Sequence, residues 1–179
     1  QKSSELLGDI EEDSTISQRF MDRQRLSSVI KVSQDISSIL NLDTLLEIVM
    51  GKAIEVTGAQ RGFLFIYDDK SQALAIKAYQ GVEKLAKADY SSHIVSQSFD
   101  KDMTIITTNA EKDERLLHFE SVRAMGLKSI LCVPLRYHVK VIGVCYLDNP
   151  LSAGVFTHED AELMSVFMSQ AAIAIENAR

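Results

Sequence analysis

The chain has 179 residues, of which 46% are hydrophobic and 25% charged, and its formal net charge is −6. That length corresponds to one ordinary domain with some additional chain, and the composition is typical of a soluble globular protein. The basic side chains are scattered along an acidic chain, which argues against nucleic-acid binding. No apolar run approaches the roughly 18–20 residues that cross a bilayer, which argues against membrane insertion.

The cysteine content bears on the compartment. The chain has two cysteines, Cys132 and Cys145, and each lies inside an apolar run. Two such cysteines, without a signal-peptide pattern, argue against a disulfide-stapled secreted module. We therefore expect a cytoplasmic protein.

The first 40 residues predict a linker followed by a helix. Residues 1–18 are acidic and rich in serine, a composition typical of a linker. Over residues 19–40 apolar side chains recur at intervals of three and four, which predicts an amphipathic helix. Its apolar surface is broader than a single stripe, so we expect this helix to pack against both its own domain and a second subunit.

A second helix is predicted over residues 44–57. Asn41 and Asp43 are candidate N-caps, because their short side chains accept hydrogen bonds from free backbone N–H groups. Thr44 and Glu47 have the spacing of a capping box. Gly58 follows the last turn and is the expected C-terminal cap.

The middle of the chain predicts a hairpin, a further strand and two irregular segments. Residues 62–67 and 73–79 are strands by their aromatic and β-branched content, and a polar turn separates them. The first irregular segment contains a short helix capped at residues 91–92, and a strand at 103–107 follows. The second irregular segment, residues 109–126, carries another predicted helix.

The most apolar stretch is a predicted β-hairpin towards the end of the sequence. Residues 130–135 and 141–147 are rich in Val, Ile and Leu without alternating polar residues, which is typical of strands buried on both faces. A short connection joins them. If the hairpin turns at residues 138–139, then Cys132 and Cys145 are direct cross-strand neighbours.

The order of the elements predicts an α+β fold. A last helix is expected over residues 157–179, opened by a capping box of Thr157 and Asp160. Antiparallel strands between terminal helices favour a sheet with those helices on one face. The two irregular segments should then cover the opposite face, because a sheet that is apolar on both sides needs cover on both.

Several segments, in order, resemble the GAF family of sensory modules, which occur in cyclic-nucleotide phosphodiesterases, adenylyl cyclases, histidine kinases and enhancer-binding activators. They are LCVPL at residues 131–135, GVCYLDN at 143–149 and QAAIAIENA at 170–178. TGAQRGF at 57–63 also fits the family's entry into its first strand. The resemblance covers about residues 26–179.

The resemblance implies a central antiparallel sheet of about six strands, with helices on one face and a small-molecule pocket on the other. Residues 41–179 would form the domain. The helices at 19–40 and 157–179 would pair between two subunits of a homodimer, and the second would lead to an output domain in the same chain. The residues expected at this helical interface are Leu26, Ile30, Ile36, Leu163, Val166 and Ile173.

The candidate pocket residues come from the strands and the two irregular segments. Strand aromatics, Tyr67 among them, could stack on a planar ligand, and the helix start at residues 91–94 offers N–H groups to a phosphate or carboxylate. Two histidines could contact an anionic ligand, although surface or loop packing is the commoner role of such residues. Each candidate also has a plainer role in the core or in a cap. The full set is Phe63, Phe65, Ser92, His93, Ile94, His118, Cys132 and Tyr146.

The sequence does not name a cofactor. The spaced Asn-Lys…Phe…Asp-Glu signature of cyclic-nucleotide-binding relatives cannot be placed on this chain, so a cyclic nucleotide stays a possible ligand without that support. Bilin-binding relatives use a Cys followed by His, whereas Val133 follows Cys132 and Tyr146 follows Cys145. Neither bilin nor haem is expected. The histidines lack the short spacing of a metal site.

Three functions remain open. The first is a non-catalytic regulatory domain that binds a small molecule and signals through its terminal helices. The second is a GAF-type thiol reductase acting on free methionine sulfoxide through Cys132 or Cys145, which would need an exposed thiolate of lowered pKa. The third is a dimerisation scaffold whose pocket is filled by side chains.

Overall fold

The computed structural model describes residues 21, 24–25, 27–28, 31, 41–82, 90–110, 112–116 and 126–179. The six described residues before residue 41 are helical and exposed, within the helix predicted there. The predicted linker, most of the helix predicted in the second irregular segment, and four of the named candidates lie outside the described residues. These four are Leu26, Ile30, Ile36 and His118.

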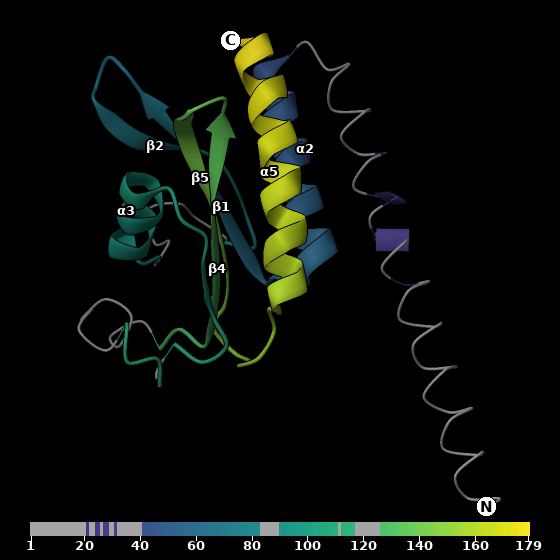
Figure 1. Cartoon of the computed structure of the whole chain (residues 1–179), viewed down its shortest axis with the longest axis vertical. Coiled ribbons are helices and arrows are strands. Elements are labelled where there is room, and N and C mark those ends of the chain that lie inside the picture. The colour runs from purple at the N-terminus through teal and green to yellow at the C-terminus, as the bar shows by residue number, and fades with distance from the viewer. Residues whose placement is uncertain are drawn as a thin grey trace, which may run out of the picture.

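The described elements form one antiparallel sheet with helices on both sides (Figure 1). The strand order is β2-β1-β5-β4-β3. This confirms the predicted α+β class, with five strands among the described residues. The elements in chain order are α2 (Leu42–Thr57), β1 (Arg61–Asp68), β2 (Ala73–Gln80), α3 (Ser92–Lys101), β3 (Ile105–Thr107), β4 (Ser129–Tyr137), β5 (Lys140–Asn149) and α5 (His158–Ala178).

Local capping sets the ends of the long helices. The side chain of Asn41 accepts a hydrogen bond from the backbone N–H of Thr44 at 3.0 Å, so α2 begins at Leu42, two residues before the predicted start. The Asn41 cap is therefore confirmed, and the capping box that begins at Thr44 is wrong. Gly58 ends α2 in the left-handed conformation, with φ 68°, as expected for a C-terminal cap.

The capping box at the start of α5 is also confirmed. The Thr157 hydroxyl accepts from the Asp160 backbone N–H at 3.1 Å, and the Asp160 carboxylate accepts from the Thr157 N–H at 2.9 Å. Each residue thus satisfies a backbone or side-chain group of the other. No helix in the described part of the chain is long and apolar enough to cross a membrane.

The two faces of the sheet bury different side chains, because successive residues of a strand point to opposite sides. Helices α2 and α5 pack on one side, which we call the helix face: α2 covers β1 and β2, α5 covers β4, and the two helices touch. Helix α3 packs on the other side, the α3 face. Thus Leu64 and Ile66 of β1 enter the helix-face core, whereas Phe63 and Phe65 enter the α3-face core. In β4 likewise, Leu131 and Val133 enter the helix-face core and Ile130 and Cys132 the α3-face core, which confirms the prediction of a strand that is apolar on both sides.

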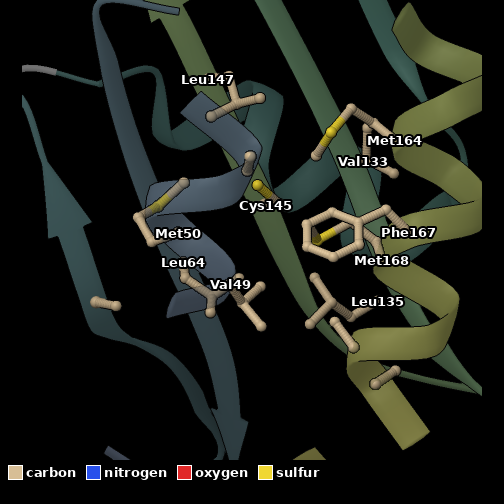
Figure 2. Packing of buried hydrophobic residues seen from close by; sticks show 14 of the residues in the cluster. Val49, Met50, Leu64, Val133, Leu135, Cys145, Leu147, Met164, Phe167 and Met168 are labelled. Carbon is tan, nitrogen blue, oxygen red and sulfur yellow. The ribbon is translucent and has the colours of Figure 1, made fainter. Parts of the chain in front are cut away.

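The helix-face core is filled by aliphatic and sulfur-containing side chains together with two buried rings, Phe156 and Phe167. Met164, Phe167 and Met168 point from α5 towards the sheet, while Val49 and Met50 approach from α2 (Figure 2). Each of these side chains is at most 2% exposed. Burial of apolar surface stabilises the fold by about 25 cal/mol per Å², so these buried side chains contribute to its stability.

The β4–β5 hairpin turns where predicted, but a bulge changes its register. Tyr137 pairs with Lys140 across a two-residue loop. Between Leu135 and Arg136 the register shifts by one residue, so that Cys132 faces Tyr146 and Cys145 faces Val133. A shift of one residue moves a side chain to the opposite face. The predicted cysteine pairing is therefore wrong: Cys132 lies in the α3-face core and Cys145 in the helix-face core.

Candidate functional site

A pocket of about 320 Å³ opens on the α3 face, between α3 and the β1–β2 hairpin. Its volume is at the lower end of the range for small-molecule sites, about 300–1,000 Å³. The lining combines aromatic and aliphatic walls with a few polar groups. The lining residues are Phe65, Tyr67, Gln72, Ala73, Leu74, Tyr90, Ser92, Val95, Ser96, Phe99 and Asp100.

Four of the lining residues are aromatic, and they contact one another in two pairs. The rings of Tyr67 and Phe99 stack with centroids 5.3 Å apart and planes 16° apart. The rings of Phe65 and Tyr90 meet edge-on at 5.0 Å. Below them Phe63, fully buried, lies 5.5 Å from Tyr90. These contacts join the aromatic wall of the pocket to the α3-face core, of which Phe63 and Phe65 are buried members.

Helix α3 supplies one wall of the pocket and is fixed at both ends. At its start the Ser91 hydroxyl caps the backbone N–H of Ile94 at 3.4 Å. At its end Arg136 of β4 donates to the Asp102 carbonyl oxygen at 2.8 Å and pairs with the Asp102 carboxylate. The Ser98 hydroxyl also donates to the Met103 carbonyl at 2.9 Å. The helix is thereby tied to the sheet beside the pocket.

The predicted site residues fall into three groups. Phe65 and Ser92 line the pocket. His93 is exposed on α3 and is not among the lining residues, and His118 lies outside the described residues. The remaining candidates are buried in the α3-face core beneath the pocket, namely Phe63, Ile94, Cys132 and Tyr146.

Sequence reasoning missed most of the α3 wall. Val95, Ser96, Phe99 and Asp100 follow Ser92 at helical spacings of three, four, seven and eight residues, which places them on one side of the helix. That periodicity was a signal that could have found them once Ser92 was named. Tyr90, Gln72 and Leu74 lie in a loop, in a turn and on an edge strand, and no sequence motif marks them.

A buried ion pair lies on the same face as the aromatic core. Arg61, at the start of β1, donates to both carboxylate oxygens of Asp148, at the end of β5, over 2.8 and 2.6 Å. Asp148 has no exposed surface. Burial raises the pKa of this carboxyl, and the hydrogen bonds and charge of Arg61 oppose that rise. The pair joins the first strand to the centre of the sheet.

Neither cysteine has the properties of a reactive thiol. Both are fully buried, and burial raises the pKa of the Cys145 thiol to about 12 and that of Cys132 further. A thiolate nucleophile needs a lowered pKa and access to solvent. The bulge described above also places the two sulfurs on opposite faces of the sheet. Among the described residues, no group of three or more His, Cys, Asp or Glu side chains is arranged to hold a metal ion.

The described chain is thus an antiparallel sheet packed by two helices on one face and hollowed into an aromatic-lined pocket on the other. The sequence profile of the GAF domain matches residues 41–175, which is most of the chain. The chain therefore belongs to the GAF domain family, a family of regulatory and sensory domains.

Two relatives are much longer than this chain. It is 35% identical over 75 residues to hybrid signal transduction histidine kinase G of Dictyostelium discoideum, covering 42% of this chain and 2% of that protein. It is 26% identical over 155 residues to the probable 3′,5′-cyclic phosphodiesterase pde-5 of Caenorhabditis elegans, covering 79% of this chain and 21% of that protein. The chain thus spans a small part of either relative.

Two solved structures share the fold at low sequence identity. The GAF domain of an Acinetobacter phosphoenolpyruvate-protein phosphotransferase superimposes with a TM-score of 0.71 at 20% identity, covering 87% of this chain and 94% of that one. Free methionine-R-sulfoxide reductase of Neisseria meningitidis superimposes with a TM-score of 0.67 at 16% identity, covering 84% and 87%. At such identities the likeness concerns the fold alone.

Proposed function

We propose that this GAF domain is a non-catalytic sensory module of a cytoplasmic signalling protein, and that it binds a small molecule in the pocket between α3 and the β1–β2 hairpin. The observation that carries the proposal is the open, aromatic-lined space of about 320 Å³ beside the α3-face core. A scaffold whose pocket is filled by side chains would leave no such space. The buried, protonated cysteines likewise favour binding over thiol chemistry.

Native mass spectrometry of the freshly purified chain tests ligand retention, and thermal unfolding with a panel of small molecules, cyclic nucleotides included, tests binding. A ligand at about 100 times its Kd stabilises the folded state by about 2.7 kcal/mol, which raises the Tm by about 5–10 °C for a domain of this size. Ser96 lines the pocket, so Ser96→Phe should fill it and abolish the shift. Ser152→Phe, in the exposed loop after β5, is the matched control.

If no molecule is retained and no panel member raises the Tm, the domain is not a sensor of this kind. If a ligand raises the Tm equally in the wild type and in Ser96→Phe, the binding site lies elsewhere on the chain. Either result contradicts the proposed pocket.

We further propose that the signal leaves through a homodimer of the terminal helices, and that α5 leads towards an output domain in the same chain. In favour of the dimer, α5 exposes apolar side chains away from its own core: Val166 is 52% exposed and Ile173 43%, and Leu163 beside them is only partly buried. The great length of the curated relatives favours a larger signalling protein around this domain.

Sedimentation equilibrium tests the dimer. A Val166→Glu/Ile173→Glu variant places two charges in the proposed contact and should be monomeric at concentrations where the wild type is dimeric. Val139→Glu is the matched control, because Val139 is fully exposed in the β4–β5 turn. A wild-type chain that stays monomeric at high micromolar concentration would rule this interface out.

A further inference from the structure

The chemistry of the pocket wall points to the charge of its ligand. Asp100 is the one charged residue among the described residues that line the pocket, and no Lys, Arg or His is among them. A phosphate or carboxylate in this space would therefore meet a carboxylate and no cationic partner from that lining. The lining thus disfavours an anion.

Three features favour a positive charge instead. Asp100, an exposed residue of the lining, supplies a carboxylate to the pocket. It lies in the last turn of α3, where the C-terminal end of the helix carries partial negative charge from its free carbonyl groups; Lys101, the basic residue of that turn, is not among the lining residues. The pocket is also walled by four aromatic rings, whose electron-rich faces attract cations within about 6 Å.

The position of the carboxylate beside the rings defines the shape of the ligand. Phe99 and Asp100 are consecutive on α3, and the Phe99 ring stacks on Tyr67 across the pocket wall. A ligand with its cationic group near Asp100 would therefore keep its body against the aromatic and aliphatic wall of Phe65, Leu74 and Val95. A volume of about 320 Å³, at the lower end of the range for small-molecule sites, suits a small ligand.

We propose that the pocket selects a small organic cation, an amine with an aromatic or apolar body, through Asp100 and the aromatic wall formed by Phe65, Tyr67, Tyr90 and Phe99. This inference rests on the proposed sensory function and adds the chemical class of its ligand. Asp100 sets the charge preference. The rings hold the body of the ligand and add cation–π attraction.

Protein-observed NMR titration of the full chain at neutral pH tests the charge preference with three probes of nearly equal size: 2-phenylethylamine, 2-phenylethanol and phenylacetate. The amine should bind at the pocket about five- to tenfold more tightly than the alcohol, because ionic and cation–π contacts at a partly exposed site are modest. Phenylacetate should bind most weakly. Amide shifts should centre on α3 and the β1–β2 hairpin.

Variants separate the two parts of the site. Asp100→Asn should remove most of the preference of the amine over the alcohol and leave only the cation–π part, whereas Asp100→Glu should keep most of it. Phe99→Leu retains an apolar wall but loses a ring, and should weaken both probes. Glu47→Gln is the matched control, because it removes the same charge from an exposed position on α2, on the opposite face of the sheet. Thermal unfolding of each variant checks that it is folded.

Three outcomes would overturn the proposal. Phenylacetate could bind as tightly as the amine, Asp100→Asn could bind the amine as Glu47→Gln does, or neither the amine nor the alcohol could bind at all. If an anionic molecule such as a cyclic nucleotide instead raises the Tm and Ser96→Phe abolishes the effect, the sensory function stands and the preference for a cation falls. If nothing binds in either experiment, both proposals fall.

Discussion

The two faces of the sheet are built from the same five strands but are covered in different ways. The helix face carries two long helices and is packed with aliphatic and methionine side chains. The α3 face is covered, in the described part of the chain, by a helix of 10 residues, and its core contains an aromatic group, a buried ion pair and an open pocket. One face is filled by regular packing, and the other is shaped by large rings that leave a gap.

This difference indicates how one sheet can supply both stability and sensing. Long helices fill a surface because aliphatic side chains interdigitate to the density of a solid. Rings fixed by mutual contacts cannot collapse into a neighbouring space, so Phe65 and Tyr90 wall the pocket instead of closing it. The α3 face should therefore respond to ligands and open locally, while the helix face should resist both.

The largest contrast expected between the faces is in thiol protection. Each face holds one buried cysteine, Cys132 on the α3 face and Cys145 on the helix face. Raising the pKa of Cys145 from 9.0 to about 12 lowers its thiolate fraction about a thousandfold. Both thiols should therefore react with a thiol reagent at least about a thousandfold more slowly in the native chain than in urea.

The two rates should also differ from each other. Cys132 lies under α3, of 10 residues, whereas Cys145 lies in the middle of the core beneath α2 and α5 (Figure 2). A buried thiol can meet the reagent only after local opening, which also removes the burial that raises its pKa, so the order of the two rates follows the free energy of opening and not the native pKa values. Opening needs less free energy where fewer buried contacts break, so Cys132 should react about tenfold or more faster than Cys145. Cys132→Ala and Cys145→Ala variants isolate each thiol. Equal rates, or faster reaction of Cys145, would show that the two faces open together.

The next contrast concerns the aromatic residues of the two faces. Phe167 is 2% exposed in the helix-face core, so Phe167→Ala should lower the free energy of unfolding by about 3–5 kcal/mol, the effect of an enclosed cavity. Phe99 is half-buried beside an existing space, so Phe99→Ala should lower it by about 1–2 kcal/mol. Urea unfolding followed by circular dichroism measures both. Glu162→Ala, at an exposed position on α5, is the control and should change the free energy of unfolding by less than about 0.5 kcal/mol. Equal losses in Phe167→Ala and Phe99→Ala would contradict the expected difference between the two faces.

The sequence predicted those parts of the fold that depend on neighbours along the chain. The caps at Asn41, Gly58 and Thr157, and the apolar strands on both sides of the β4–β5 turn, follow from local chemistry and periodicity. The register of the β4–β5 hairpin could not be predicted from local sequence, because it also depends on how β5 contacts β1, a strand distant in the sequence. A Cβ at Gly143 would lie 2.2 Å from the carbonyl oxygen of Phe65, so β1 approaches β5 closely beside the bulge that separates the cysteines.

The candidate site was only partly predictable for a similar reason. Phe65 and Ser92 were marked by residue type and by position at a helix start. Asp100 reads as an ordinary solvated acid in the sequence. The pocket wall that contains Asp100 forms only when α3 packs on the sheet. One contact of that packing, between Arg136 and Asp102, joins residues 34 positions apart in the sequence. Sequence periodicity therefore predicts the helices and strands, whereas the packing of α3 against the sheet determines which residues line the pocket.

A third contrast between the faces is their dependence on pH, and the Arg61–Asp148 pair is its source. Arg61→Met leaves a fully buried carboxylate without its partner and should lower the free energy of unfolding by about 3 kcal/mol near neutral pH. Burial already raises the pKa of Asp148 above 3.8, and loss of Arg61 raises it further. The folded variant therefore binds a proton at pH values where the unfolded chain has released it. The free energy of unfolding of the variant therefore falls as the pH rises from the pKa of Asp148 in the unfolded chain to its higher pKa in the folded variant.

The loss caused by Arg61→Met should thus shrink as the pH is lowered from about 7 towards 5, because a neutral Asp148 needs no cationic partner. Equilibrium unfolding in urea at several pH values measures this slope. Asp148→Asn in the Arg61→Met background should recover part of the stability and remove the slope. Phe167→Ala is the control from the other face: no titrating group is added or exposed in the fold, so its loss should be the same at each pH. If the loss in Arg61→Met does not change with pH, the Asp148 carboxylate has become hydrated in the variant and stays ionised. The α3 face would then rearrange around this ion pair as readily as around the pocket.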